Sequence, residues 1–116
     1  MRNGWTNFTR TTNKYHSKKT MVGDKTFDSK KEADRFVELT LLEKAKKIQD
    51  LKTQVSFPLI PKSAWGREIR YIADFTYYED GKLVVEDTKS PVTRTPVYRL
   101  KKRLFEERYQ MKLKES

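Results

Sequence analysis

Two aspartates and a lysine are spaced so that a β-hairpin would bring them together. Residues 70–89 contain two runs rich in β-branched and aromatic residues on either side of Asp80-Gly81, a dipeptide typical of the two-residue type I′ turn. Counting outward from this turn places Asp74 opposite Asp87. Because strand side chains alternate between faces, Lys89 is expected to point the same way as the aspartates, and the other face receives Val84, Glu86 and Thr88.

An aspartate pair at such a position predicts a metal site. Carboxylates directly opposite each other on neighbouring strands have Cβ atoms roughly 5 Å apart and repel, so a purely structural sheet tends to avoid them. A divalent cation such as Mg²⁺ removes the repulsion, because it binds one or two carboxylates together with substrate phosphates. Lys89 would then approach a water or a phosphate. The alternative is a solvated hairpin whose aspartates and lysine simply face water.

Composition indicates one small domain with a polyanionic partner. The chain has 116 residues, no cysteine and a net charge of +10, and it has no apolar run near the roughly 20 residues that span a membrane. Basic residues outnumber acidic ones by eight to two in residues 1–31 and by eight to three in residues 90–116, whereas residues 32–89 are nearly neutral. Nucleic acid is the expected partner. The alternative is that the basic ends only confer solubility. Without a secretory signal, the expected location is the cytoplasm.

Residues 1–19 are predicted to form a basic N-terminal arm that precedes a single domain of residues 20–116. The arm mixes aromatic residues with cations, a composition suited to base stacking and phosphate contacts. Its cations assigned to nucleic acid are Arg10, Lys14, Lys18 and Lys19. The equally open alternative is a flexible arm whose aromatic residues pack on the domain or on a second subunit.

Periodicity predicts the elements before the hairpin. Residues 20–27 form a short strand pair around Gly23-Asp24, and Ser29-Lys-Lys-Glu32 is a capping box at the start of a helix that runs to about residue 46. Residues 51–61 alternate as an edge strand with one apolar face. Glu32 is explained as the cap, although it shares a helix face with Phe36 and Leu39 and so points toward the protein.

A second helix follows the hairpin, with Thr95 as its N-cap, Pro96 in its first turn and its end near Tyr109. Helical spacing predicts an inward face of Val97, Leu100, Leu104 and Phe105. The opposite face is predicted to be a basic, partly aromatic surface of Tyr98, Arg99, Lys101, Lys102 and Arg103. Three cations of this face, Arg99, Lys101 and Lys102, are predicted to bind nucleic acid together with the preceding Arg94. The alternative is an ordinary solvated helix face. Residues 111–115 predict a last short strand.

From residue 29 onward the order helix, three strands, helix, strand resembles the PD-(D/E)XK nuclease superfamily, α/β proteins with a restriction-endonuclease-like core. More narrowly, five segments resemble a family of small phage and prophage nuclease-like proteins, some of which are Holliday-junction-resolvase-like. These segments are 13–15, 27–32, 71–75, 85–89 and 100–105. The resemblance implies a mixed central sheet flanked by two helices. Ala73 stands where the superfamily has proline and Asp87 where glutamate is commoner; neither change removes a ligand. Ser90 stands where glycine is expected after the lysine.

The resemblance also implies an activity, that of a Mg²⁺-dependent DNA endonuclease acting on Holliday junctions or other branched DNA in phage recombination or replication, with Mn²⁺ as a substitute metal. Asp74 and Asp87 match the metal-binding acids, Lys89 matches the motif lysine, and Glu32 matches the acidic residue that such nucleases often add from the first helix. The hydrolysis would be metal-assisted. A resolvase that makes two symmetric cuts would be a homodimer. The alternatives are a DNA-binding module with the fold but no chemistry, and a subunit of a larger recombination or transposition complex.

Overall fold

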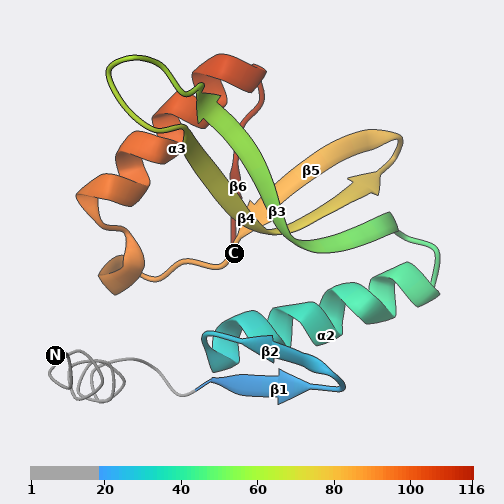
Figure 1. Cartoon of the computed structure of the whole chain (residues 1–116). Coiled ribbons are helices and arrows are strands. Elements are labelled where there is room, and N and C mark those ends of the chain that lie inside the picture. Colours follow the sequence, from blue (N-terminus) through green and yellow to red (C-terminus); the bar gives the residue numbers. More distant parts are fainter. Residues whose placement is uncertain (1–18) are drawn as a thin grey trace, which may run out of the picture. The chain divides into compact units, whose positions relative to one another are not determined.

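The computed structural model describes residues 19–116, whose backbone divides into two compact units, one ending at Val37 and the other spanning Glu38–Ser116 (Figure 1). The first contains an antiparallel hairpin of β1 (Thr20–Val22) and β2 (Lys25–Phe27). In this unit α2 (Lys30–Lys44) begins after Ser29, whose Oγ accepts the N–H of Glu32 at 3.1 Å. The predicted strand pair and the Ser29 cap are therefore confirmed.

The second unit is built on a four-stranded sheet in the order β3-β4-β5-β6. Its strands are β3 (Gln49–Ile60), β4 (Ile69–Glu79), β5 (Lys82–Asp87) and β6 (Lys114–Glu115). The first three pair antiparallel, and β6 pairs parallel with β5, so the sheet is mixed. Figure 1 shows how α3 (Pro96–Tyr109) lies beside the β3 and β4 strands of this sheet. The protein is therefore an α/β protein with a mixed sheet and two α-helices among the described residues, as predicted.

The turn between β4 and β5 sets the register of the hairpin. Asp80 and Gly81 have φ angles of 54° and 76°, and a type I′ turn needs positive φ at both central positions. Glu79 pairs with Lys82 at the turn, and the ladder continues in step as far as the Phe75–Glu86 pair. The register obtained by counting from Asp80-Gly81 is confirmed along this ladder.

The edge strand β3 also follows the sequence pattern. From Leu51 to Leu59 every second side chain is half-buried or buried, while most of those between them are exposed. An alternating pattern of this kind marks a strand with one face toward the core. Both expectations for this strand, its apolar face and its place at an edge, are confirmed.

The core of the second unit is largely aromatic, and this decides which face of α3 is buried. Tyr98 and Phe105 are buried, and the ring of Phe105 lies 5.5 Å from that of Tyr71. Val97 and Leu100, predicted to point inward, are 63% and 60% exposed. The prediction is confirmed for Phe105 and for Leu104, which packs against the core, and is wrong for Val97 and Leu100. A neighbouring stripe of larger rings buries more apolar area than these two side chains would. The helix is therefore rotated so that Tyr98, which was predicted to lie on the surface, is in the core.

No helix in the part of the chain that the structure describes is long and apolar enough to cross a membrane.

Candidate functional site

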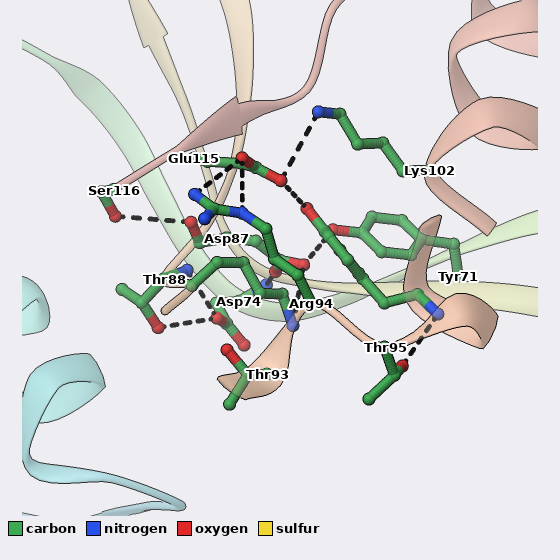
Figure 2. Close-up of polar contacts among 12 residues, drawn as sticks. Tyr71, Asp74, Asp87, Thr88, Thr93, Arg94, Thr95, Lys102, Glu115 and Ser116 are labelled. Atoms are coloured by element: carbon green, nitrogen blue, oxygen red, sulfur yellow. Dashed lines mark hydrogen bonds and ion pairs between the residues drawn. The ribbon is translucent and has the colours of Figure 1, made fainter. Parts of the chain in front are cut away.

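The two aspartates lie where β4 and β5 stop pairing through their backbones. One position beyond the Phe75–Glu86 pair, the N–H of Asp74 donates to Asp87 Oδ1 at 2.9 Å. In return, the N–H of Thr88 donates to Asp74 Oδ2 at 2.9 Å. Each carboxylate therefore accepts a backbone N–H of the opposite strand just beyond the end of the regular ladder. As a result the two acidic side chains are held against each other's strand, as Figure 2 shows.

On its other edge, away from β4, β5 pairs with β6 at Glu86 and Asp87. The N–H of Ser116 donates to the carbonyl of Asp87 at 2.9 Å, and the N–H of Lys89 donates to the carbonyl of Ser116 at 3.0 Å. This parallel partner fixes the backbone from Asp87 to Lys89, beyond the last backbone pair of β4 and β5. The end of the chain is thus part of the scaffold of the site.

Thr88 differs from the prediction. Alternation placed its side chain on the face opposite the aspartates, but its Oγ donates to Asp74 Oδ2 at 3.0 Å. The strand ends at Asp87, and alternation describes only regular strand backbone. Thr88 therefore belongs to the site, where it binds Asp74 through both its N–H and its hydroxyl.

Asp87 is the buried member of the pair, with 2% of its surface exposed. Its Oδ2 accepts a hydrogen bond from the Tyr71 hydroxyl and lies 3.7 Å from Lys89 Nζ. Burial, and then the charge of Asp74, raise the pKa of Asp87 to about 6, although Tyr71 and Lys89 act in the opposite direction. Burial and the charge of Asp87 also raise the pKa of Tyr71, so its hydroxyl stays protonated and donates.

The pair fits a hard divalent cation. Asp74 is half-buried, and its Oδ1 has no hydrogen-bond partner within residues 19–116. Mg²⁺ sites commonly use one or two carboxylates and complete the shell with waters and substrate phosphates. Between residues 19 and 116 no group of three or more His, Cys, Asp or Glu side chains could enclose a metal alone. A cation bound by Asp74 and Asp87 would need further ligands, such as waters or a substrate phosphate.

Glu115 is a further acidic residue beside the site, and the sequence reading did not single it out. It is the Cα partner of Asp87 across the parallel β5–β6 pair. Its Oε1 lies 3.1 Å from Arg94 Nη2, and its Oε2 lies 3.5 Å from Lys102 Nζ (Figure 2). The strand at 111–115 was anticipated, but which strand it joins depends on a long-range pairing that local periodicity does not report.

On β3, the residue level with Asp74 is Gln54. Its neighbours Thr53 and Val55 pair with Phe75 and Ala73, so Gln54 lies across from Asp74. Its φ is 53°, a left-handed value that is costly for a residue with a side chain inside a strand. Backbone strain of this kind is concentrated at functional sites. No sequence signal distinguishes this glutamine from its neighbours.

The remaining predicted residues are distributed as follows. Glu32 is buried in the first unit, near the start of α2, and its role in the site stays a prediction. Lys19 is exposed and lies 3.4 Å from Asp28 Oδ1. On α3, Arg99 is exposed and Lys101 half-buried. Arg94 and Lys102 are not free surface cations, because Glu115 holds both. Arg10, Lys14 and Lys18 lie outside the described residues.

Tyr71→Phe is expected to weaken Mg²⁺ binding as well as stability. The variant loses a donor to a buried carboxylate, which costs about 1–3 kcal/mol of unfolding free energy. Because this hydrogen bond lowers the pKa of Asp87, its loss raises that pKa further and favours the protonated, non-binding form. Loss of a partner that supports a ligand typically costs roughly 10- to 100-fold in metal affinity. Calorimetric titration with Mg²⁺ at pH 7 measures the affinity.

Tyr77→Phe is the matched control for that variant. The Tyr77 hydroxyl donates to Oε1 of the buried Glu86 at 2.6 Å, one position before the aspartate pair. The control should lose comparable stability and keep its Mg²⁺ affinity. Equal affinities in both variants would show that Tyr71 does not support Asp87 as a ligand.

No curated protein and no solved structure matches this chain. A family model described as "Protein of unknown function (DUF1064)" matches residues 12–116. That match covers most of the sequence, including both aspartates and Lys89, and the chain therefore belongs to the DUF1064 family.

Proposed function

We propose that this protein is a Mg²⁺-dependent DNA endonuclease that cuts branched DNA such as Holliday junctions. The observation that carries the proposal is the Asp74–Asp87 pair at the point where β4 and β5 separate, with Lys89 Nζ 3.7 Å from Asp87 Oδ2. Two adjacent acids can hold a metal for phosphodiester hydrolysis, and a lysine beside them can stabilise the charge that develops on the phosphate. The choice of branched DNA rests on the sequence resemblance to resolvase-like phage proteins.

The energetics of the pair favour a cation-binding role over a structural one. A ladder closed by backbone carbonyls would hold β4 and β5 together without placing two carboxylates in contact. Here the two carboxylates accept the backbone N–H groups that join the strands, and Asp87 is buried beside the negative charge of Asp74. Like charges across a strand pair destabilise a sheet. A function that needs negative charge at this position accounts for the arrangement.

Each residue then has a chemical task. The N–H of Asp74 and the hydroxyl of Tyr71 orient the two oxygens of Asp87, and Thr88 binds Oδ2 of Asp74. A bound Mg²⁺ would polarise the scissile phosphate and acidify a water. Lys89 would hold that water or stabilise the negative charge that develops on the phosphate. Cations such as the exposed Arg99 and the half-buried Lys101 would bind backbone phosphates without reading sequence.

A second candidate function, a DNA-binding module without chemistry, is favoured by one contact. Tyr71 and Lys89 already bind Asp87 Oδ2, so a metal must share this oxygen with two donors of the protein. If these contacts persist on DNA, the site would be closed to metal. The same outcome is expected of a subunit that becomes active only within a larger recombination complex.

A cleavage panel separates these functions. The purified protein is mixed with labelled four-way junction, flap, duplex and single-stranded DNA, in Mg²⁺, in Mn²⁺ and in EDTA. We expect metal-dependent cuts that favour the branched substrates and weaken steeply as salt rises. Symmetric cuts across the junction, together with a dimeric mass in solution, would indicate a resolvase. Tight binding that needs no metal and yields no cut would overturn the nuclease proposal in favour of the binding module.

A further inference from the structure

One buried tyrosine lies between Lys89 and Glu115. The ring of Tyr98, a residue of α3 with 8% of its surface exposed, has its centroid 4.2 Å from Lys89 Nζ. The hydroxyl of the same ring donates to Glu115 Oε2 at 2.6 Å. Lys89 itself is 19% exposed in its side chain and reaches Asp87 at 3.7 Å. Tyr98 therefore joins the lysine of the candidate site to the acid on β6.

Both contacts of Tyr98 are attractive and directional. An ammonium group over the face of an aromatic ring is attracted by the negative charge of the ring face, and more strongly where water is excluded. The hydrogen bond from a phenol to a carboxylate is charge-assisted and short. In agreement, this hydrogen bond is the leading cause that lowers the pKa of Glu115. The ring can therefore neither turn nor slide without losing one of its partners.

Glu115 is itself fixed from several sides. It is paired in register with Asp87, which places it at the level of the site. Arg94 Nε and Nη2 lie 3.2 and 3.1 Å from its Oε1, and Lys102 Nζ lies 3.5 Å from its Oε2. Two cations and a phenol thus hold one carboxylate in a single orientation. The Tyr98 hydroxyl meets an acceptor that is already in place.

We infer that Tyr98, held by Glu115, is a positioning residue that keeps the ammonium group of Lys89 beside Asp87. Without the ring, the flexible lysine stem would have several rotamers available, and only some of them would place Nζ at the reacting phosphate. The inference rests on the proposed nuclease function for its catalytic consequence. The placement of Lys89 itself can be measured without catalysis.

Three substitutions distinguish the effect of the Tyr98 ring from the effect of its hydroxyl and from that of core packing. Tyr98→Phe keeps the ring under Lys89, Tyr98→Leu removes it, and Tyr109→Leu is the packing control. Tyr109 lies on the same helix, packs on Phe105 and donates to the Pro58 carbonyl at 2.7 Å. It packs against the same core as Tyr98.

The first readout is the NMR signal of the Lys89 ε-methylene protons, assigned by comparison with Lys89→Arg. Protons above an aromatic ring are shifted upfield, so wild type and Tyr109→Leu should show the full shift. Tyr98→Phe keeps the ring but loses its hydrogen bond to Glu115, so its signal should move part of the way. Tyr98→Leu should return it to the position of an exposed lysine, and Glu115→Ala should move it part of the way. An unshifted signal in wild type, or a shifted one in Tyr98→Leu, would overturn the inference whether or not the protein cuts DNA.

The second readout is cleavage kinetics on the substrate that the wild type cuts best. Tyr98→Leu should lower kcat about tenfold, as expected for the loss of a desolvated cation–π contact, with little change in KM. Tyr98→Phe should restore kcat to within about threefold of wild type, because it keeps the ring. In a Lys89→Ala background, Tyr98→Leu should cause no further loss. A full additional loss in that background would show that the tyrosine acts by packing alone and would overturn the inference. A wild type that cuts no substrate would refute the proposed function and leave the NMR result standing.

Discussion

The substitution Asp87→Asn is expected to abolish Mg²⁺-dependent cleavage while the protein stays folded. Asp87→Asn keeps an oxygen for the N–H of Asp74 and a polar group beside the Tyr71 hydroxyl, but it removes the charge that a metal needs. Metal polarisation of a phosphate is worth several kcal/mol, so its loss should lower kcat by about a thousandfold or more. Asp74→Asn should have an effect of similar size.

Binding and cleavage must be measured together in this experiment. Each variant adds one unit of positive net charge, so affinity for junction DNA in EDTA should stay equal or rise slightly. Asp80→Asn is the matched control, since it makes the same charge change on the exposed turn, where asparagine tolerates a positive φ. Cleavage that survives in Asp87→Asn would place the chemistry elsewhere. A loss shared by Asp80→Asn would reveal a general effect of charge.

The substitution Asp87→Asn is also expected to change how the free energy of unfolding depends on pH. In the folded protein, burial and the charge of Asp74 raise the pKa of Asp87 from 3.8 to about 6. A carboxyl with a raised folded-state pKa binds its proton more tightly when folded, so the folded state is penalised as that proton is lost. The penalty is absent below about pH 4, grows up to about pH 6 and is complete above it, where it reaches about 3 kcal/mol.

Unfolding in urea with EDTA, from pH 4 upward, tests this sign. The stability of Asp87→Asn relative to wild type should rise between about pH 4 and about pH 6 and then level off. Asp80→Asn should follow the wild-type curve with a constant offset. A difference between Asp87→Asn and wild type that does not vary with pH would mean that Asp87 titrates normally in the folded protein. That result would contradict the expected repulsion between the buried Asp87 carboxylate and Asp74.

The hairpin that carries the site could be predicted from the sequence, because its determinants are local. Asp80-Gly81 selects a turn of one type, and the turn sets the register of both strands. The Ser29 cap and the alternating face of β3 follow from similarly short-range rules. The aspartates and Lys89 were therefore identifiable as one group before any tertiary contact was known.

Predictions failed where the regular period ended or where two faces competed. Thr88 lies just past the last residue of β5, so its hydroxyl turns to Asp74 instead of away from it. On α3 an aliphatic and an aromatic stripe lie one residue apart, and packing against Tyr71 decided in favour of the aromatic one. Both stripes have the same helical period, so the sequence pattern alone does not show which one is buried.

The sequence by itself determined the strands, the turn and the three chemical groups that the hairpin brings together, because each depends on residues near it in the chain. Only the tertiary structure decided that β5, paired with β4 on one edge, pairs on its other edge with β6 and Ser116. It also decided that Glu115, held by Arg94 and Lys102, accepts the hydroxyl of Tyr98, whose ring lies against Lys89. These contacts join residues far apart in sequence, and their free energy arises from burial and charge pairing that exist only after the chain has folded.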